Sequence, residues 1–210
     1  MNQQSLFPHY GNKNNDTVVV TALQSELPTL ALEEILFTGV GKINATHALT
    51  RYLERNKHIR TVINYGTAGG VLDVNKGEIV ECSTFVQGDM DLGPLTPGPG
   101  ITLNDPKDVC AVLQFNRDGK IVRTQDQFIS DLSGLEMFEN LLDGKRFNLV
   151  DMEAYALAKV CKLMDRDFIC YKYISDDADD GAEEQWEENV SGGEEQFYKI
   201  LCEKHGYERL

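Results

Sequence analysis

The clearest pattern of apolar and polar positions lies between residues 149 and 176. Apolar residues at positions 154, 157, 158, 161 and 164 follow the spacing of a helix with one apolar stripe. A short apolar run ends at residue 150, before this stripe, and a β-rich run covers residues 168–174 after it. We therefore expect a strand, a helix and a second strand, joined as a right-handed parallel crossover.

Two carboxylates follow the ends of these predicted strands. Glu153 comes just after the first strand and Asp176 just after the second. Because parallel strands end at the same edge of a sheet, we expect both side chains to lie at that edge. Open α/β sheets bind their ligands there, so the pair predicts a ligand site.

The other apolar runs predict further strands and helices around this unit. Strands are expected at 17–23, 35–38, 60–65, 76–82, 84–91, 119–124 and 147–150, and helices at 45–55, 132–142 and 194–205. No internal repeat or linker divides the chain, and 210 residues suit one sizeable core. The sequence predicts a single domain of the α/β class over residues 17–210.

Glycines follow two of the predicted strands. The run Gly39-Val40-Gly41 resembles the start of a dinucleotide-binding fingerprint, but Asn44 stands at the third glycine position and no acid follows about 20 residues on. A plain tight turn is therefore the better interpretation. The turn expected at Gly66–Gly70 would let a ligand approach the backbone closely, because glycines leave its N–H groups exposed.

Composition is that of a soluble globular protein, with 41% hydrophobic and 26% charged residues. No apolar run approaches the roughly 20 residues of a membrane span. Residues 1–16 are polar and lack an apolar signal core, which predicts a flexible leader and a cytoplasmic protein that does not bind membranes. Five cysteines without close pairing predict buried free thiols.

A net charge of −14 argues against nucleic acid as a partner, because phosphates require a basic surface. Residues 176–188 carry eight acids and no base, which is typical of a solvated loop. This run nearly matches a calcium-binding loop, but Ala178 stands where a ligand oxygen is required, so we expect no metal.

Four stretches carry a resemblance to a known family. They are 62–70 (VINYGTAGG), 88–91 (GDMD), 151–154 (DMEA) and 174–179 (ISDDAD). In this order they resemble the purine nucleoside phosphorylase/uridine phosphorylase superfamily, and within it most of all the methylthioadenosine/S-adenosylhomocysteine nucleosidases. The resemblance implies a mixed, twisted central sheet flanked by helices, in a homodimer that cleaves the N-glycosidic bond of a purine nucleoside without cofactor or metal.

The resemblance also implies a role for individual residues. Asp176 would protonate N7 of the leaving base, with Ser175 orienting its carboxylate, and Glu26 would hold the attacking water. Glu153 would hold the ribose hydroxyls, and Met152 would pack on the sugar. Phe128 would stack on the purine, while the backbone of Ile129 would read its edge. The base and water side would be lined by Thr67, Ala68 and Gly69. Phe128 could instead be a core residue, since aromatic residues after strands often are.

These residue types suit glycosidic cleavage. The transition state resembles an oxocarbenium ion, so the leaving base needs a proton and the opposite face a positioned water. One carboxyl must be protonated while another is ionised. Acidic neighbours at positions 177, 179 and 180 are expected to raise the pKa of Asp176 by repulsion.

Water is favoured over phosphate as the nucleophile. Phosphorylases of the superfamily carry an arginine where this chain has Asn64, and an arginine-bearing glycine turn where it has Gln24-Ser25-Glu26. Without such cations a dianionic phosphate would be poorly stabilised. The sequence therefore predicts hydrolysis, and a phosphate-dependent phosphorylase or an inactive nucleoside-binding protein are the alternatives.

Overall fold

The computed structural model describes residues 9–12, 15–32, 34–96, 100–103, 111–115, 118–133, 142 and 144–209. Its strands are β1 (His9–Asn12), β2 (Thr17–Thr21), β3 (Ala31–Leu32), β4 (Ile35–Phe37), β5 (Thr61–Gly70), β6 (Ile79–Gln87), β7 (Val112–Gln114), β8 (Lys120–Thr124), β9 (Leu149–Asp151), β10 (Asp167–Asp176) and β11 (Tyr207–Arg209). Its helices are α1 (Lys42–Arg55), α2 (Ala154–Leu163), α3 (Ala182–Asn189) and α4 (Glu194–His205), with short 3₁₀ turns η1 (Gln24–Glu26) and η2 (Gly93–Leu95).

The main sheet has eight strands in the order β10-β6-β8-β9-β5-β2-β4, with β7 on β6. The strand β10 also pairs with β5, so β5, β10, β6, β8 and β9 close into a ring. The strands β2, β4 and β10 run parallel to β5, whereas β9 runs antiparallel to it and parallel to β8. The α/β fold with a mixed central sheet, predicted from the sequence, is therefore confirmed.

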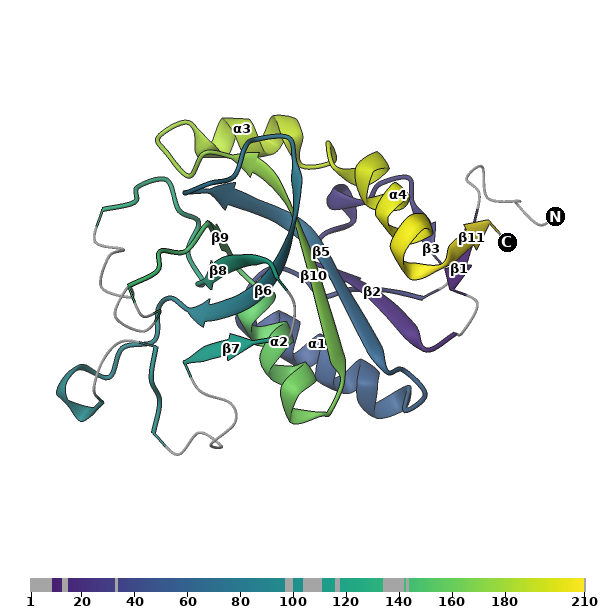
Figure 1. The fold of residues 1–210 in the computed structure, drawn as a ribbon, viewed down its shortest axis with the longest axis horizontal. Coiled ribbons are helices and arrows are strands. Elements are labelled where there is room, and N and C mark those ends of the chain that lie inside the picture. The colour runs from purple at the N-terminus through teal and green to yellow at the C-terminus, as the bar shows by residue number, and fades with distance from the viewer. Residues whose placement is uncertain are drawn as a thin grey trace.

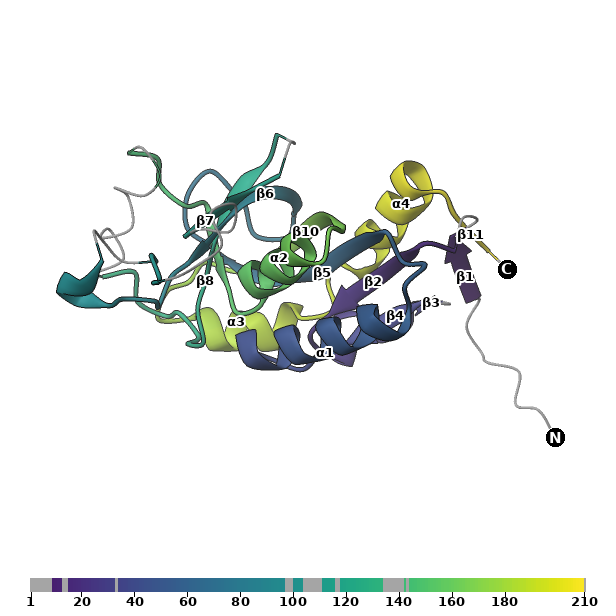
Figure 2. The same cartoon turned by 90° about the horizontal axis from the view of Figure 1, so that it is seen from below.

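Alternating side chains of the strands fill a separate core on each face of the sheet. Val18 and Val20 of β2 pack with buried residues of α1 and α2, while Val19 packs with Phe197 and Leu201 of α4. Figure 1 shows α1 and α2 next to each other, and Figure 2 shows α1 and α4 on opposite sides of β2. The apolar stripe predicted from residue 154 onwards is the buried face of α2.

A second, small sheet joins the two ends of the described chain, in the order β11-β1-β3. It lies beside α4 in Figure 1. The strand β1 belongs to the stretch 1–16 predicted as a flexible leader, and the structure corrects that prediction for residues 9–12. The physical reason is Tyr10, whose ring lies 4.5 Å from that of Tyr198 and packs on the core under α4.

The structure also corrects the predicted parallel crossover. Since β9 is antiparallel to β5 and β10 is parallel to it, β9 and β10 run in opposite directions. The helix between them was predicted correctly, but the three-residue strand β9 pairs with the distant β5 and β8 and takes its direction from them.

The structure also corrects three local predictions. The glycines 66–70, predicted as a turn, continue the strand β5, and residues 79–87 form one strand instead of parts of two. The acidic run 176–188, predicted as a solvated loop, becomes helical from Ala182 onwards. Most of the predicted helix 132–142 lies outside the described residues.

Three of the described cysteines are buried free thiols, as predicted: Cys82, Cys161 and Cys170. Cys202 is free but only partly buried, and Cys110 lies outside the described residues. Among the described helices, none combines the length and the apolar character that crossing a membrane would require.

Candidate active site

The site lies where one edge of β5 changes its partner. Along residues 61–64 that edge pairs with β2, and at residues 69 and 70 it pairs with β9. Since β2 and β9 run in opposite directions, their carboxyl ends point toward each other across the stretch 65–68 between them. The segments that leave these two strands therefore converge, and they carry Glu26 and Glu153.

A cavity of about 190 Å³ occupies this place. It is lined by Ala22, Leu23, Glu26, Val40, Thr67, Ala68, Gly69, Gln127, Phe128, Ile129, Val150, Asp151, Met152, Glu153, Asp176 and Trp186. All the site residues named from the sequence are among them except Ser175, which lies behind Asp176. The structure thus brings Glu153 and Asp176 together although the parallel crossover that suggested it does not exist.

Asp176 ends β10 and is held by two hydrogen bonds. The hydroxyl of Ser175 donates to its Oδ2 at 2.8 Å, and the backbone N–H of Ala178 donates to its Oδ1 at 3.0 Å. Burial raises the pKa of Asp176, with further contributions from Asp177 and Asp179, and outweighs the two hydrogen bonds, which act to lower it. The predicted direction is confirmed, but burial is a larger cause than the neighbouring charges. A raised pKa favours the protonated carboxyl that a general acid requires.

Glu26 lies in η1, just after β2, and is surrounded by donors. Its Oε2 accepts hydrogen bonds from the Thr21 hydroxyl at 2.7 Å and from the N–H groups of Ala22 and Leu23 at 3.1 and 2.9 Å. Its Oε1 accepts from the N–H and the hydroxyl of Thr67 at 2.8 and 3.1 Å. These contacts hold the buried carboxylate in one orientation at the wall of the cavity.

Glu153 precedes α2 and accepts a hydrogen bond from the N–H of Gly41 at 2.8 Å. The φ of Gly41 is +94°, a conformation that glycine adopts readily and other residues rarely do. The turn 39–41 thus serves as a tight turn that offers its N–H to a carboxylate. Burial, together with repulsion from Asp151, raises the pKa of Glu153 to about 7.

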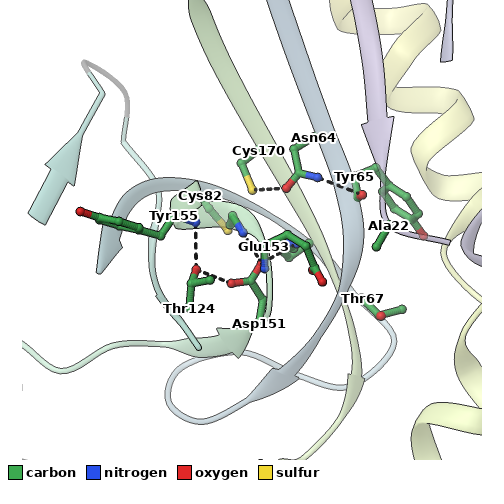
Figure 3. Close-up of polar contacts among 12 residues, drawn as sticks. Ala22, Asn64, Tyr65, Thr67, Cys82, Thr124, Asp151, Glu153, Tyr155 and Cys170 are labelled. Carbon is green, nitrogen blue, oxygen red and sulfur yellow. Dashed lines mark hydrogen bonds and ion pairs between the residues drawn. The ribbon is translucent and has the colours of Figure 1, made fainter. Parts of the chain in front are cut away.

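A buried ion pair lies next to the carboxylates of Glu26 and Glu153. Lys172 Nζ lies 2.8 Å from Asp151 Oδ2, and both side chains are almost fully enclosed. Asp151 Oδ2 also accepts the N–H of Ala154 at 2.8 Å, and its Oδ1 accepts the Thr124 hydroxyl at 2.5 Å (Figure 3). Burial alone would lower the pKa of Lys172, but Asp151 and its other neighbours raise it, so the lysine is charged.

A Cβ at Gly66 would lie 3.1 Å from Lys172 Nζ and 3.2 Å from Glu26 Oε1, so glycine leaves room for both groups.

Three residues of the site were not predicted from the sequence: Lys172, Asp151 and Trp186. The signal for Lys172 was present, because this lysine is the only charged residue in the otherwise uncharged β-rich run 168–174. Such a lysine requires an acidic partner, and the sequence does not say which acid of the chain reaches it.

A second, more exposed ion-pair cluster joins two segments that contribute Val40 and Phe128 to the cavity lining. Lys42 Nζ lies 2.6 Å from Asp89 Oδ2 and 2.9 Å from Asp126 Oδ2. The N–H of Lys42 donates to Asp126 Oδ1 at 2.7 Å, and the N–H of Asp126 donates to Asp89 Oδ2 at 2.9 Å. The cluster therefore ties the turn that bears Gly41 to the segment that bears Phe128, a residue 42% exposed at the cavity wall.

The charge of the cavity wall is entirely acidic within the described residues. Its lining contains four carboxylates and no lysine or arginine: Glu26, Asp151, Glu153 and Asp176. Over the same part of the chain, no three His, Cys, Asp or Glu side chains are grouped closely enough to hold a metal ion. The arrangement suits a neutral ligand that donates hydrogen bonds to carboxylates.

Comparison with known proteins places this geometry in a family. The model of the phosphorylase superfamily matches residues 19–203. A 5′-methylthioadenosine/S-adenosylhomocysteine nucleosidase of Bacillus thuringiensis is 30% identical over 182 residues, which cover 77% of this chain and 76% of that protein. The nucleosidase of the same name from Shewanella piezotolerans is 27% identical over 196 residues, covering 85% and 84%.

Solved structures share the fold. The nucleosidase of S. pneumoniae with the transition-state inhibitor MT-ImmA superposes with a TM-score of 0.73 at 15% identity, covering 88% of this chain and 96% of that one. The futalosine hydrolase of Helicobacter pylori gives a TM-score of 0.74 at 14% identity, covering 89% and 97%. The resemblance seen in the sequence motifs is thereby confirmed, and the chain belongs to the phosphorylase superfamily.

Proposed function

We propose that this protein is a purine-nucleoside N-glycosidase that releases the free base by hydrolysis, acting on methylthioadenosine, S-adenosylhomocysteine or a related 5′-modified nucleoside. The observation that carries the proposal is that Asp176, Glu26 and Glu153 line one cavity, each from a different strand end. The two relatives named above are nucleosidases, and this chain matches them over most of their length, which supports the same reaction.

The proposed reaction divides the carboxylates by role. Asp176, whose pKa is raised, gives its proton to N7 of the base as the bond between C1′ and N9 breaks. A water held by Glu26 attacks C1′ and loses a proton to that carboxylate. Glu153 accepts hydrogen bonds from the ribose hydroxyls. The products are the neutral base and the free sugar, so atoms and charges balance.

The other residues named from the sequence have supporting roles in this proposal. Phe128 stacks on the purine, the backbone of Ile129 reads its edge, and Met152 packs on the sugar. Thr67, Ala68 and Gly69 line the base and water side. Ser175 does not touch the substrate and orients Asp176 through its hydroxyl, 2.8 Å from Oδ2.

The charge of the cavity favours water over phosphate as the nucleophile. A phosphate dianion would meet carboxylates without a lysine or arginine among the described lining residues, and such a site repels it. The same argument disfavours nucleotides with a 5′-phosphate. Methylthioadenosine and S-adenosylhomocysteine both lack a phosphate, in agreement with this lining.

The test is incubation with a nucleoside panel, with and without phosphate, followed by chromatography for free base. Hydrolysis predicts base release without phosphate and, in ¹⁸O-labelled water, one labelled oxygen in the sugar product. Dependence on phosphate would support a phosphorylase instead. Thermal stabilisation by nucleosides without base release would indicate a binding protein.

We further propose that the protein is cytoplasmic, forms a homodimer, and binds neither nucleic acid nor membranes. The net charge of −14 opposes binding to phosphate backbones and anionic lipids. The exposed apolar side chains of Phe37, Val40 and Ile43, close together before and at the start of α1, suit a subunit contact beside the cavity. Sedimentation should give the mass of two chains for the wild type and of one chain for Ile43→Glu.

A further inference from the structure

Trp186 is the only tryptophan of the chain and lies in the cavity wall, where none of the roles above requires it. It belongs to α3, the eight-residue helix that follows the Asp176 loop. Its indole Nε1–H donates a hydrogen bond to Thr67 Oγ1 at 3.0 Å. The side chain is thus joined to β5 by a polar contact.

This hydrogen bond sets the direction of the next one. A threonine hydroxyl has one proton to donate and lone pairs with which to accept. Because Thr67 Oγ1 accepts from Trp186, its proton is directed to Glu26 Oε1, 3.1 Å away. The indole, the hydroxyl and the carboxylate therefore form a directed chain from α3 to Glu26.

The same helix also holds the backbone on both sides of Asp176. The N–H of Asp177 donates to Gln185 Oε1 at 3.2 Å, and the side-chain amide of Asn189 donates to the Ser175 carbonyl at 3.3 Å. Gln185, Trp186 and Asn189 lie within about one helical turn. One rigid element therefore contacts the supports of both carboxyl groups that the reaction uses.

We propose that Trp186 is a positioning residue, which aligns Glu26 with the attacking water through Thr67. This inference rests on the proposed function, and it adds a coupling between α3 and the water side of the site. The indole N–H acts on the orientation of the carboxylate, while the ring forms part of the cavity wall.

The variant Trp186→Phe separates these two contributions, because it keeps an aromatic ring and removes the N–H. We expect kcat to fall about tenfold, the size typical of one lost positioning hydrogen bond, while KM changes less than about threefold. Thr67→Val should give a similar loss of kcat. The double variant should be no worse than either single one, since all three break the same chain. Glu187→Gln, on the exposed side of α3, is the matched control and should keep wild-type kinetics.

A second measurement does not depend on activity. As the chain has one tryptophan, its NMR spectrum contains one indole N–H signal, which should exchange slowly with water and shift in Thr67→Val. Wild-type kcat in a folded Trp186→Phe, additive losses in the double variant, or an indole signal unmoved by Thr67→Val would each overturn the inference. If wild-type protein released no base while the indole signal behaved as expected, the proposed function would fail and the contact would stand.

Discussion

At the scale of single residues, the proposed reaction depends on carboxyl groups that line one cavity but have different surroundings. Asp176 is buried and close to other acids, which favours its protonated form. Glu26 is instead surrounded by N–H and hydroxyl donors, which direct their protons at its oxygens. A protonated acid and an acceptor of protons on opposite sides of one ligand are what glycosidic cleavage requires.

Replacing Asp176 by asparagine should strongly reduce turnover and leave the fold intact. The amide cannot deliver a proton to N7, so base release should fall by about 10² to 10⁴-fold, the usual contribution of a general acid. The rate is measured by chromatography of the free base, and folding by circular dichroism. Asp177→Asn changes the same loop at a solvent-exposed carboxylate and should keep most of the activity. Base release at the wild-type rate from Asp176→Asn would contradict the assignment.

Replacing Lys172 by methionine should destabilise the protein strongly. The substitution keeps the length of the side chain but leaves Asp151 buried without its cation, which costs about 3–5 kcal/mol in comparable pairs. Urea unfolding measures the loss. Adding Asp151→Asn should restore part of the stability, because the uncompensated charge disappears. A single variant as stable as the wild type would show that the pair contributes nothing.

At the scale of elements, the short loops around the cavity hold each other in place. The turn before α1 supplies the N–H that Glu153 accepts, and the segment after β8 supplies Phe128 and Ile129. Lys42 joins the two through Asp126 and Asp89. The positions of the residues that line this part of the cavity thus depend on contacts outside it.

Lys42→Met should therefore weaken substrate binding more than it weakens the fold. Because its acidic partners are 36% and 42% exposed, the loss in stability should stay below about 1 kcal/mol. KM should rise several-fold as the turn and the Phe128 segment separate, while kcat changes less, and Lys42→Arg should recover part of the effect. Initial rates over a range of substrate concentrations measure both constants. Lys199→Met removes an exposed ion pair on α4, away from the cavity, and should leave both constants unchanged.

The elements themselves were largely predictable from the sequence. The apolar stripe of α2 and the β-rich run of β10 have the periods that their structures impose, and both formed where expected. Strand direction was not predictable in this way, because three-residue β9 takes its direction from its pairing with Gly69 and Gly70, far away in the sequence. For the same reason β1 was missed, since its pairing partners are β11 and β3.

At the scale of the whole molecule, the site results from a change of partners along one strand. The ring of five strands closes through β5, and the two strands that share one of its edges stop short of each other. The resulting gap lets the segments after β2 and β9 meet Asp176 from β10. The family motifs contain Glu153 and Asp176, and the resemblance to the family pointed to Glu26. The pairing of Lys172 with Asp151 and the place of Trp186 in the cavity wall became visible only in the structure.

The stability of the whole protein should report the environment of Glu153 through its dependence on pH. Burial raises the pKa of Glu153 from 4.5 to about 7, so between these values the folded state holds a proton that the unfolded state has lost. The folded state therefore binds more protons, and stability falls as the pH rises through this window.

Glu153→Gln keeps the acceptor for the Gly41 N–H and removes the titration. The variant should gain stability relative to the wild type from pH 5 to pH 8 by up to about 3 kcal/mol. Urea unfolding at both pH values measures the difference between the two proteins, in which the titration of groups that do not interact with Glu153 cancels. A difference that is the same at pH 5 and pH 8 would mean that Glu153 is ionised in the folded state throughout this range.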